Sequence, residues 1–153
     1  MVLVDVRAYP GSRRHPQWGR ASLQHWLPAA GIEYVHVREL GGRRQARPDS
    51  PNGGWRELAL RGYADHMASP EFADGLGRLE ALAHERATVV MCSEAVWWRC
   101  HRRLLADVLT ARGWRVEHLG VGERRAVHEL TEFALVDELG VLTYPPMQSS
   151  LLT

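Results

Sequence analysis

Short apolar runs alternate with amphipathic segments along most of this chain, and this alternation limits the possible folds more than any other feature. Four runs are typical of strands: residues 2–6, 32–37, 87–92 and 114–119. Four segments carry helical spacing: residues 21–30, 63–67, 70–86 and 98–112. Alternating strands and helices favour a mostly parallel sheet covered on both faces. We therefore predict an α/β fold, a mostly parallel Rossmann-like three-layer sandwich.

The length of the chain suits one domain. It has 153 residues, and domains commonly run to about 100–200 residues. We expect a core over residues 1–121 and a C-terminal extension over residues 122–153, with a final edge strand near residues 142–145. Glycine and proline interrupt residues 41–55, which predicts a long loop of the kind that is often functional.

Composition excludes two classes of protein. No apolar run approaches the roughly 20 residues that cross a bilayer, so we expect no membrane partner. The first residues are apolar rather than a basic signal region, which favours a cytoplasmic location. Two cysteines in such a chain are expected to be reduced thiols rather than a disulfide.

The basic residues are unusual because all 19 are arginine. A GC-rich genome explains this bias in part. A guanidinium group also binds phosphate through two parallel hydrogen bonds, which favours a phosphate-bearing small molecule or a nucleic acid as partner. The candidate anion-binding residues are Arg7 beside Asp5 at a strand end, Arg14 and Arg43 in loops, and Arg102.

The richest chemical segment follows the run 87–92. Cys92 and Glu94 come at the end of this predicted strand, and Cys100, His101 and Arg102 fall near the start of the next predicted helix. Sites in open α/β sheets form at the carboxyl ends of strands. The free N–H groups of a helix start and the nearby arginines also favour a thiolate. Each cysteine is equally compatible with a place in the apolar core.

Two chemistries remain open for this segment. Cys92 is a candidate nucleophile, with Glu94 or His101 as acid or base. Alternatively, Cys92, Cys100 and His101 bind zinc or iron, with Glu94, Asp5 or His128 as a candidate further ligand. A phosphatase-type loop is disfavoured, because the interval from Cys92 to Arg99 is one residue too long and lacks glycine. The loop 41–55 allows either a nucleic-acid contact through Trp55 or a Trp55 buried in the core.

Several motifs together resemble one family. They are Asp5-Val6-Arg7 with Ser12-Arg13-Arg14, Leu40-Gly41-Gly42-Arg43, Arg61-Gly62-Tyr63-Ala64, Met91-Cys92-Ser93-Glu94, Cys100-His101-Arg102 and Leu142-Thr143-Tyr144-Pro145. This pattern is similar to the family called domain of unknown function 488, over nearly the whole chain. Members usually begin with a further strand and helix, so the resemblance implies that this chain lacks that unit. An exposed sheet edge would then favour a homo-oligomer.

Three functions follow from these residues. The first is an enzyme acting on a phosphate-bearing substrate, a nucleotide or nucleic acid, through the Cys-x-Glu and Cys-His-Arg motifs. The second is a metal-binding module that uses Cys92, Cys100 and His101. The third is a non-catalytic nucleic-acid-binding protein that uses the arginine loops. The resemblance itself implies an α/β fold and a suspected enzymatic or metal-binding role, without an established reaction.

Overall fold

The structure is a computed structural model that describes residues 1–11, 14–120 and 122–147, and it is mixed α/β. Ser12 and Arg13 of the sequence motif lie outside the described residues, as does the end of the predicted extension. The chain forms two compact units, Met1–Gly42 with Ala68–Ala95 and Arg43–Met67 with Val96–Thr153. In the described part of the chain, no helix is both long enough and apolar enough to cross a membrane.

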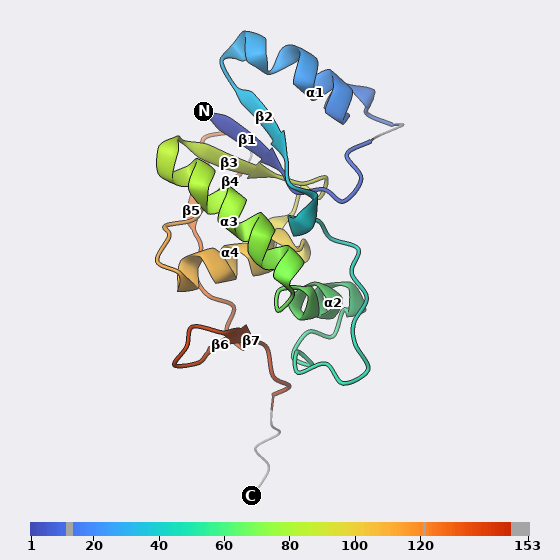
Figure 1. Cartoon of the computed structure of the whole chain (residues 1–153), viewed down its shortest axis with the longest axis vertical. Coiled ribbons are helices and arrows are strands. Elements are labelled where there is room, and N and C mark those ends of the chain that lie inside the picture. The colour runs from blue at the N-terminus through green and yellow to red at the C-terminus, as the bar shows by residue number, and fades with distance from the viewer. Residues whose placement is uncertain (12–13, 121, 148–153) are drawn as a thin grey trace, which may run out of the picture. The chain divides into compact units, whose positions relative to one another are not determined.

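The first unit is built on a small parallel sheet. Its strands are β1 (Val2–Asp5), β2 (Glu33–His36) and β3 (Thr88–Met91), in the order β2-β1-β3 (Figure 1). In the register, Val4 of the central strand pairs with both neighbours. Val2 and Val4 are fully buried, because a central parallel strand has no solvent-facing edge. The predictions that residues 2–6, 32–37 and 87–92 form strands are therefore confirmed.

The predicted helical segments 21–30 and 70–86 are helical in the first unit, and two short 3-10 helices, η1 (Pro16–Trp18) and η3 (Arg38–Leu40), lie outside them. The other helices of this unit are α1 (Arg20–Trp26), η2 (Pro28–Ala30) and α3 (Pro70–Glu85). Ser69 caps α3, since its Oγ accepts the Phe72 N–H at 3.1 Å. The predicted helix 21–30 is divided at Pro28, which lacks the N–H that would continue the α-helical hydrogen bonds.

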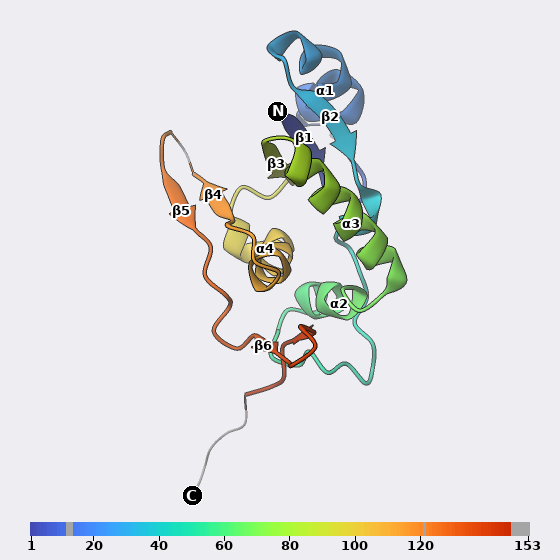
Figure 2. The same ribbon diagram turned by 60° about the vertical axis from the view of Figure 1, so that its left-hand side comes forward.

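The second unit combines two longer helices with two small antiparallel sheets. Its elements are α2 (Leu58–His66), η4 (Trp97–Arg99), α4 (Arg102–Ala111), β4 (Glu117–Leu119), β5 (Arg125–Val127), β6 (Leu135–Val136) and β7 (Leu142–Thr143). The strands pair as β4 with β5 (Figure 2) and as β6 with β7 (Figure 1). The helix predicted over residues 63–67 corresponds to α2, which begins earlier in the chain, at Leu58.

One topological prediction is wrong. The run 114–119 was expected to join the parallel sheet, but its strand β4 pairs antiparallel with β5. Five residues connect the two strands, too few for the crossover of a dozen or more that parallel pairing needs. Gly122 adopts a φ of 74°, a left-handed conformation that suits glycine at such a turn. The segment at residues 142–145 does form a short strand, β7.

The long loop 41–55 contains no helix or strand, as predicted, and its end is anchored on α2. The carboxylate of Asp65 accepts the Arg47 N–H at 2.8 Å, the Ser50 hydroxyl at 2.6 Å and the Asn52 amide at 2.8 Å. These hydrogen bonds lower the pKa of Asp65, although burial acts in the opposite direction. The loop therefore has a fixed course that its sequence alone does not indicate.

Candidate functional site

Cys100 and His101 lie at the junction between η4 and α4. The sequence predicts one helix from residue 98, but Cys100 is extended, with φ of −116° and ψ of 154°, and α4 begins only at Arg102. His101 is the N-cap residue of α4. At this break the N–H of Arg102 is directed at the sulfur of Cys100, whereas the N–H groups of the next three residues of α4 donate to the backbone carbonyls of Cys100 and His101.

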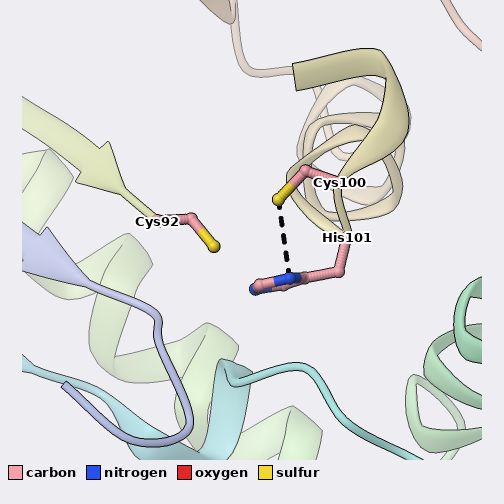
Figure 3. A group of neighbouring side chains, drawn as sticks. All are labelled: Cys92, Cys100 and His101. Atoms are coloured by element: carbon pink, nitrogen blue, oxygen red, sulfur yellow. Dashed lines mark hydrogen bonds between the residues drawn. The ribbon is translucent and has the colours of Figure 1, made fainter. Parts of the chain in front are cut away.

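The thiol and the imidazole of this pair face each other (Figure 3). Cys100 Sγ lies 3.6 Å from His101 Nδ1, and the backbone N–H of Arg102 points to the same sulfur with an N–S distance of 3.5 Å. Cys100 is only 5% exposed. A sulfur with two nitrogen neighbours is suited to the thiolate form, which is the form that binds metals or attacks electrophiles.

Tyr63 of α2 fixes the other side of the imidazole. Its ring lies 4.8 Å from that of His101 between centroids, at an angle of 48°. Tyr63 is fully buried, so its ring has little freedom to move. The contact leaves the His101 ring with a defined orientation, which a metal ligand or an acid–base group requires.

The other two residues of the cysteine motif belong to the first unit. Cys92 follows β3 directly and is half-buried, and it is a thiol rather than part of a disulfide. Glu94 is exposed two residues later. Cys92 therefore lies at the carboxyl end of a parallel strand, which is the location that the sequence predicted for it.

The predicted anion-binding residues differ in burial. Arg7 is 6% exposed and Asp5 is fully buried, and their side chains form a bidentate pair: Arg7 Nε to Asp5 Oδ1 at 2.9 Å and Nη2 to Oδ2 at 2.7 Å. Tyr34 donates its hydroxyl to the same carboxylate. Burial raises the pKa of Asp5, but these hydrogen bonds outweigh it and the pKa is lowered. Arg7 thus already neutralises a carboxylate of its own chain.

Arg14 and Arg43 are exposed, whereas Arg102 is half-buried at the start of α4. Arg43 adopts a positive φ of 61°. Trp55 is 3% exposed and packs edge-on against Phe133 at 4.8 Å. The structure therefore decides between the two readings of Trp55, because its ring is part of the core and is not available for stacking with a base.

A second polar cluster, which we call the Asp107 relay, was not predicted. Asp107 Oδ1 lies 2.7 Å from His128 Nε2, and His128 Nδ1 lies 2.8 Å from His118 Nε2. Asp107 is fully buried and also accepts the Thr131 N–H at 3.0 Å and the Tyr144 hydroxyl at 2.7 Å.

One signal in the sequence could have indicated this cluster. Asp107 shares the helical spacing of Cys100, Leu104 and Ala111, so a carboxylate occupies a core position of α4. A buried carboxylate needs several hydrogen-bond donors. The histidines that supply them could not be chosen from spacing, because they come from outside the helix.

Comparison with known proteins adds one finding about the larger, N-terminal part of the chain. A family model with the description Domain of unknown function DUF488 matches residues 1–109. No curated protein and no solved structure matches this chain. The matched residues include Cys92, Cys100 and His101, and they end before His118 and His128.

Proposed function

The chain belongs to the family described as Domain of unknown function DUF488, and from its own residues we propose that it is a metal-binding protein that holds zinc through Cys100 and His101. The observation that carries this proposal is the distance of 3.6 Å between Cys100 Sγ and His101 Nδ1. Zinc bonds of about 2.3 Å to sulfur and about 2.0–2.1 Å to nitrogen, at a tetrahedral angle of about 109°, place the two ligand atoms about 3.6 Å apart. The observed separation of the two atoms therefore agrees with two ligands of one tetrahedral ion.

Cys92 is the third ligand in this proposal. It precedes Cys100 by eight residues and is itself a thiol at a strand end. Two thiolates and one imidazole form a common zinc ligand set, and a three-ligand site leaves a fourth position for water or substrate. Such a centre would supply a Lewis acid and an activated water for hydrolysis of a phosphate-bearing substrate, a nucleotide or nucleic acid. Glu94 is the candidate base, and Arg102 is the candidate anion-binding residue.

A thiol-based enzyme without metal is the second candidate. The half-buried thiol of Cys92 at the carboxyl end of β3 favours it, because a reactive cysteine needs some exposure. Burial argues against Cys100 as the nucleophile, since reactive cysteines are usually partly exposed and Cys100 is only 5% exposed. In this mechanism Cys92, which is half-buried, is the nucleophile and His101 is the acid or base.

Metal content separates the two candidates. Elemental mass spectrometry is applied to the wild-type protein and to Cys100→Ser, His101→Gln and Cys92→Ser, all purified without chelator after growth with zinc and iron. We expect about one zinc ion per wild-type chain and loss of at least nine-tenths of it in Cys100→Ser. The matched control is His25→Gln, an exposed histidine of α1, which should keep the wild-type metal content.

The opposite result would contradict the metal site. Wild-type protein that contains no zinc or iron, and binds none when zinc is added, would leave the thiol mechanism. Alkylation of Cys92 against pH and turnover of phosphate esters then become the deciding measurements. An unchanged zinc content in Cys92→Ser would remove that residue from the ligand set while retaining the pair.

We also propose, from the sequence, a layer arrangement for the fold, a cellular location and an oligomeric state. The sheet β2-β1-β3 supports a Rossmann-like three-layer arrangement, since it is parallel and its central strand is buried. We propose a cytoplasmic location and a homo-oligomer formed through a free sheet edge. Light scattering coupled to size exclusion tests the oligomer, and a mass equal to one chain would contradict it.

A further inference from the structure

The Asp107 relay has a defined direction of hydrogen bonding. Asp107 Oδ1 accepts the Thr131 N–H at 3.0 Å, and a backbone N–H can only donate. Oδ1 is therefore an acceptor, and the His128 Nε2 that lies 2.7 Å from it carries a hydrogen. With His128 neutral, its Nδ1 is an acceptor and takes the hydrogen of His118 Nε2 at 2.8 Å. His118 is then left with an unprotonated Nδ1.

The imidazole of His118 is held in place but is not enclosed. One face of its ring stacks on Trp97, with centroids 3.7 Å apart and planes at 3°. The residue is half-buried, and in the described residues no hydrogen bond reaches its Nδ1. Here the buried end is fully bonded and the outer nitrogen is not used, which is the arrangement of a base and its supporting residues.

Burial and a nearby positive charge keep the imidazole of His118 neutral. The titratable and charged groups around it are His128 after β5 and Arg102 and Asp107 on α4. Burial lowers the pKa of His118 to about 4, and the positive charge of Arg102 acts in the same direction. The lone pair on Nδ1 is thus available at neutral pH. The positive charge of Arg102 also favours an anionic group near this ring.

We infer that His118 is a general base whose Nδ1 accepts a proton from a hydroxyl group of an anionic substrate, with His128 and Asp107 as positioning residues. The substrate O–H bond breaks, its electron pair stays on oxygen, and the proton binds His118 Nδ1. The Nε2 proton of His118 then passes to His128 Nδ1. The resulting imidazolium of His128 is paired with the buried Asp107 carboxylate, 2.7 Å away. The proton returns by the reverse route to the leaving group.

The proton-transfer residues of this site are distinct from the proposed metal ligands, although Arg102 lies near both. The histidines and the carboxylate of this site differ from Cys92, Cys100 and His101, and two of its residues lie beyond the matched family region. A failure of the metal test therefore leaves this inference unaffected, and the reverse also holds.

Nitrogen-15 NMR of the imidazole rings in the wild-type full chain tests the hydrogen-bond direction without any substitution. We expect His118 with a hydrogen on Nε2 and none on Nδ1 at pH 7, and His128 with a hydrogen on Nε2. A hydrogen on Nδ1 of His118 at pH 7 would overturn the inference.

Reaction with diethyl pyrocarbonate tests the relay chemically. His118 Nδ1 attacks a carbonyl carbon of the reagent and gains an ethoxycarbonyl group, and ethyl carbonate leaves and decomposes to carbon dioxide and ethanol. The acylated ring loses its Nε2 proton, and His128 is the acceptor. We expect His118 to react in the folded protein and to keep its rate from pH 8 down to about pH 5, because its pKa of about 4 lies lower still.

Asp107→Asn removes the negative charge of the Asp107 side chain and keeps the shape of that side chain. The amide retains an oxygen for Thr131 and His128 and places its NH2 group beside the Tyr144 hydroxyl, so the bonds and the ring tautomers can persist. The carboxylate that stabilises the His128 imidazolium is lost, and we expect at least a tenfold slower reaction at His118. The control His25→Gln should leave that rate unchanged. A folded Asp107→Asn protein that reacts at the wild-type rate, or a wild-type His118 that does not react, would overturn the inference.

Discussion

Two fully buried carboxylates, one in each unit, are stabilised in different ways. Asp5 in the first unit faces the guanidinium of Arg7, a group that stays charged at any pH at which the protein folds. Asp107 in the second unit faces His128, whose charge depends on pH. Each carboxylate also accepts the hydroxyl of a tyrosine, Tyr34 or Tyr144.

The difference indicates two roles for similar groups. A permanent ion pair at the end of β1 holds local structure and exchanges no proton in the physiological range. A carboxylate with a histidine partner, linked to a second histidine, can take up or release a proton. The same residue type is therefore structural in one unit and suited to chemistry in the other, because the partner decides whether the pair can titrate.

The largest effect is expected when Arg7 is removed. Arg7→Leu leaves the Asp5 charge buried without its cation, which should cost about 3–5 kcal/mol of the free energy of unfolding. The double variant with Asp5→Leu and Arg7→Leu removes both charges and should regain most of that loss. Urea denaturation measures both, with the exposed Arg14→Leu as control. A double variant as unstable as the single one would show that the pair acts through packing alone.

A somewhat smaller loss is expected at Asp107. Asp107→Leu leaves the donors on Thr131, His128 and Tyr144 without an acceptor, and each such buried donor costs about 1–3 kcal/mol. Because His128 can turn to another partner, we expect a total loss of about 2–4 kcal/mol by thermal or urea unfolding. Asp107→Asn keeps the acceptor oxygen and should lose only about 1 kcal/mol. Equal losses for the two variants would contradict the hydrogen-bond account.

The two tyrosines provide a direct comparison at a smaller scale. Tyr144 is fully buried and Tyr34 is half-buried. Tyr144→Phe should cost about 1–2 kcal/mol, since it removes a hydrogen bond to a buried charge. Tyr34→Phe should cost less, because Arg7 still neutralises Asp5. A larger loss of unfolding free energy for Tyr34→Phe than for Tyr144→Phe would indicate that Asp107 does not depend on its tyrosine more than Asp5 does.

The free energy of unfolding should also depend on pH, and the two units should respond in different pH windows. His118 has a pKa lowered from 6.5 to about 4, so its contribution is complete above pH 6.5 and is lost as the pH falls to about 4. The pKa of Asp5 is lowered from 3.8, so its contribution is lost only as the pH falls below that value. His118→Gln should flatten the slope between pH 6.5 and 4 alone. A wild-type slope retained in that window would contradict the assignment to His118.

Local patterns predicted the elements well where the signal lies within a few residues. The helical spacing of residues 70–86 indicated α3, and the apolar runs 2–6 and 87–92 indicated β1 and β3. The location of Cys92 at a strand end was predicted in the same way. These features depend on hydrogen bonds and burial between residues that are close in sequence.

Other features could not be predicted in this way. The start of α4 at Arg102 depends on the extended backbone of Cys100, and the pairing of β4 depends on the turn at Gly122. Neither follows from helical or strand spacing. The contact of His101 with Tyr63 joins residues that are 38 positions apart, and spacing carries no information about it.

The sequence by itself therefore determined the family, the mixed α/β character, the main helices and strands, and the segment that carries the cysteines. Only the tertiary structure decided that Arg7 is committed to Asp5, and that Asp107 is bonded to His128 and through it to His118. The physical reason is the range of the interactions. Propensity and periodicity act over one or two turns of chain, whereas a buried charge takes whichever donors the fold brings within about 3 Å of it.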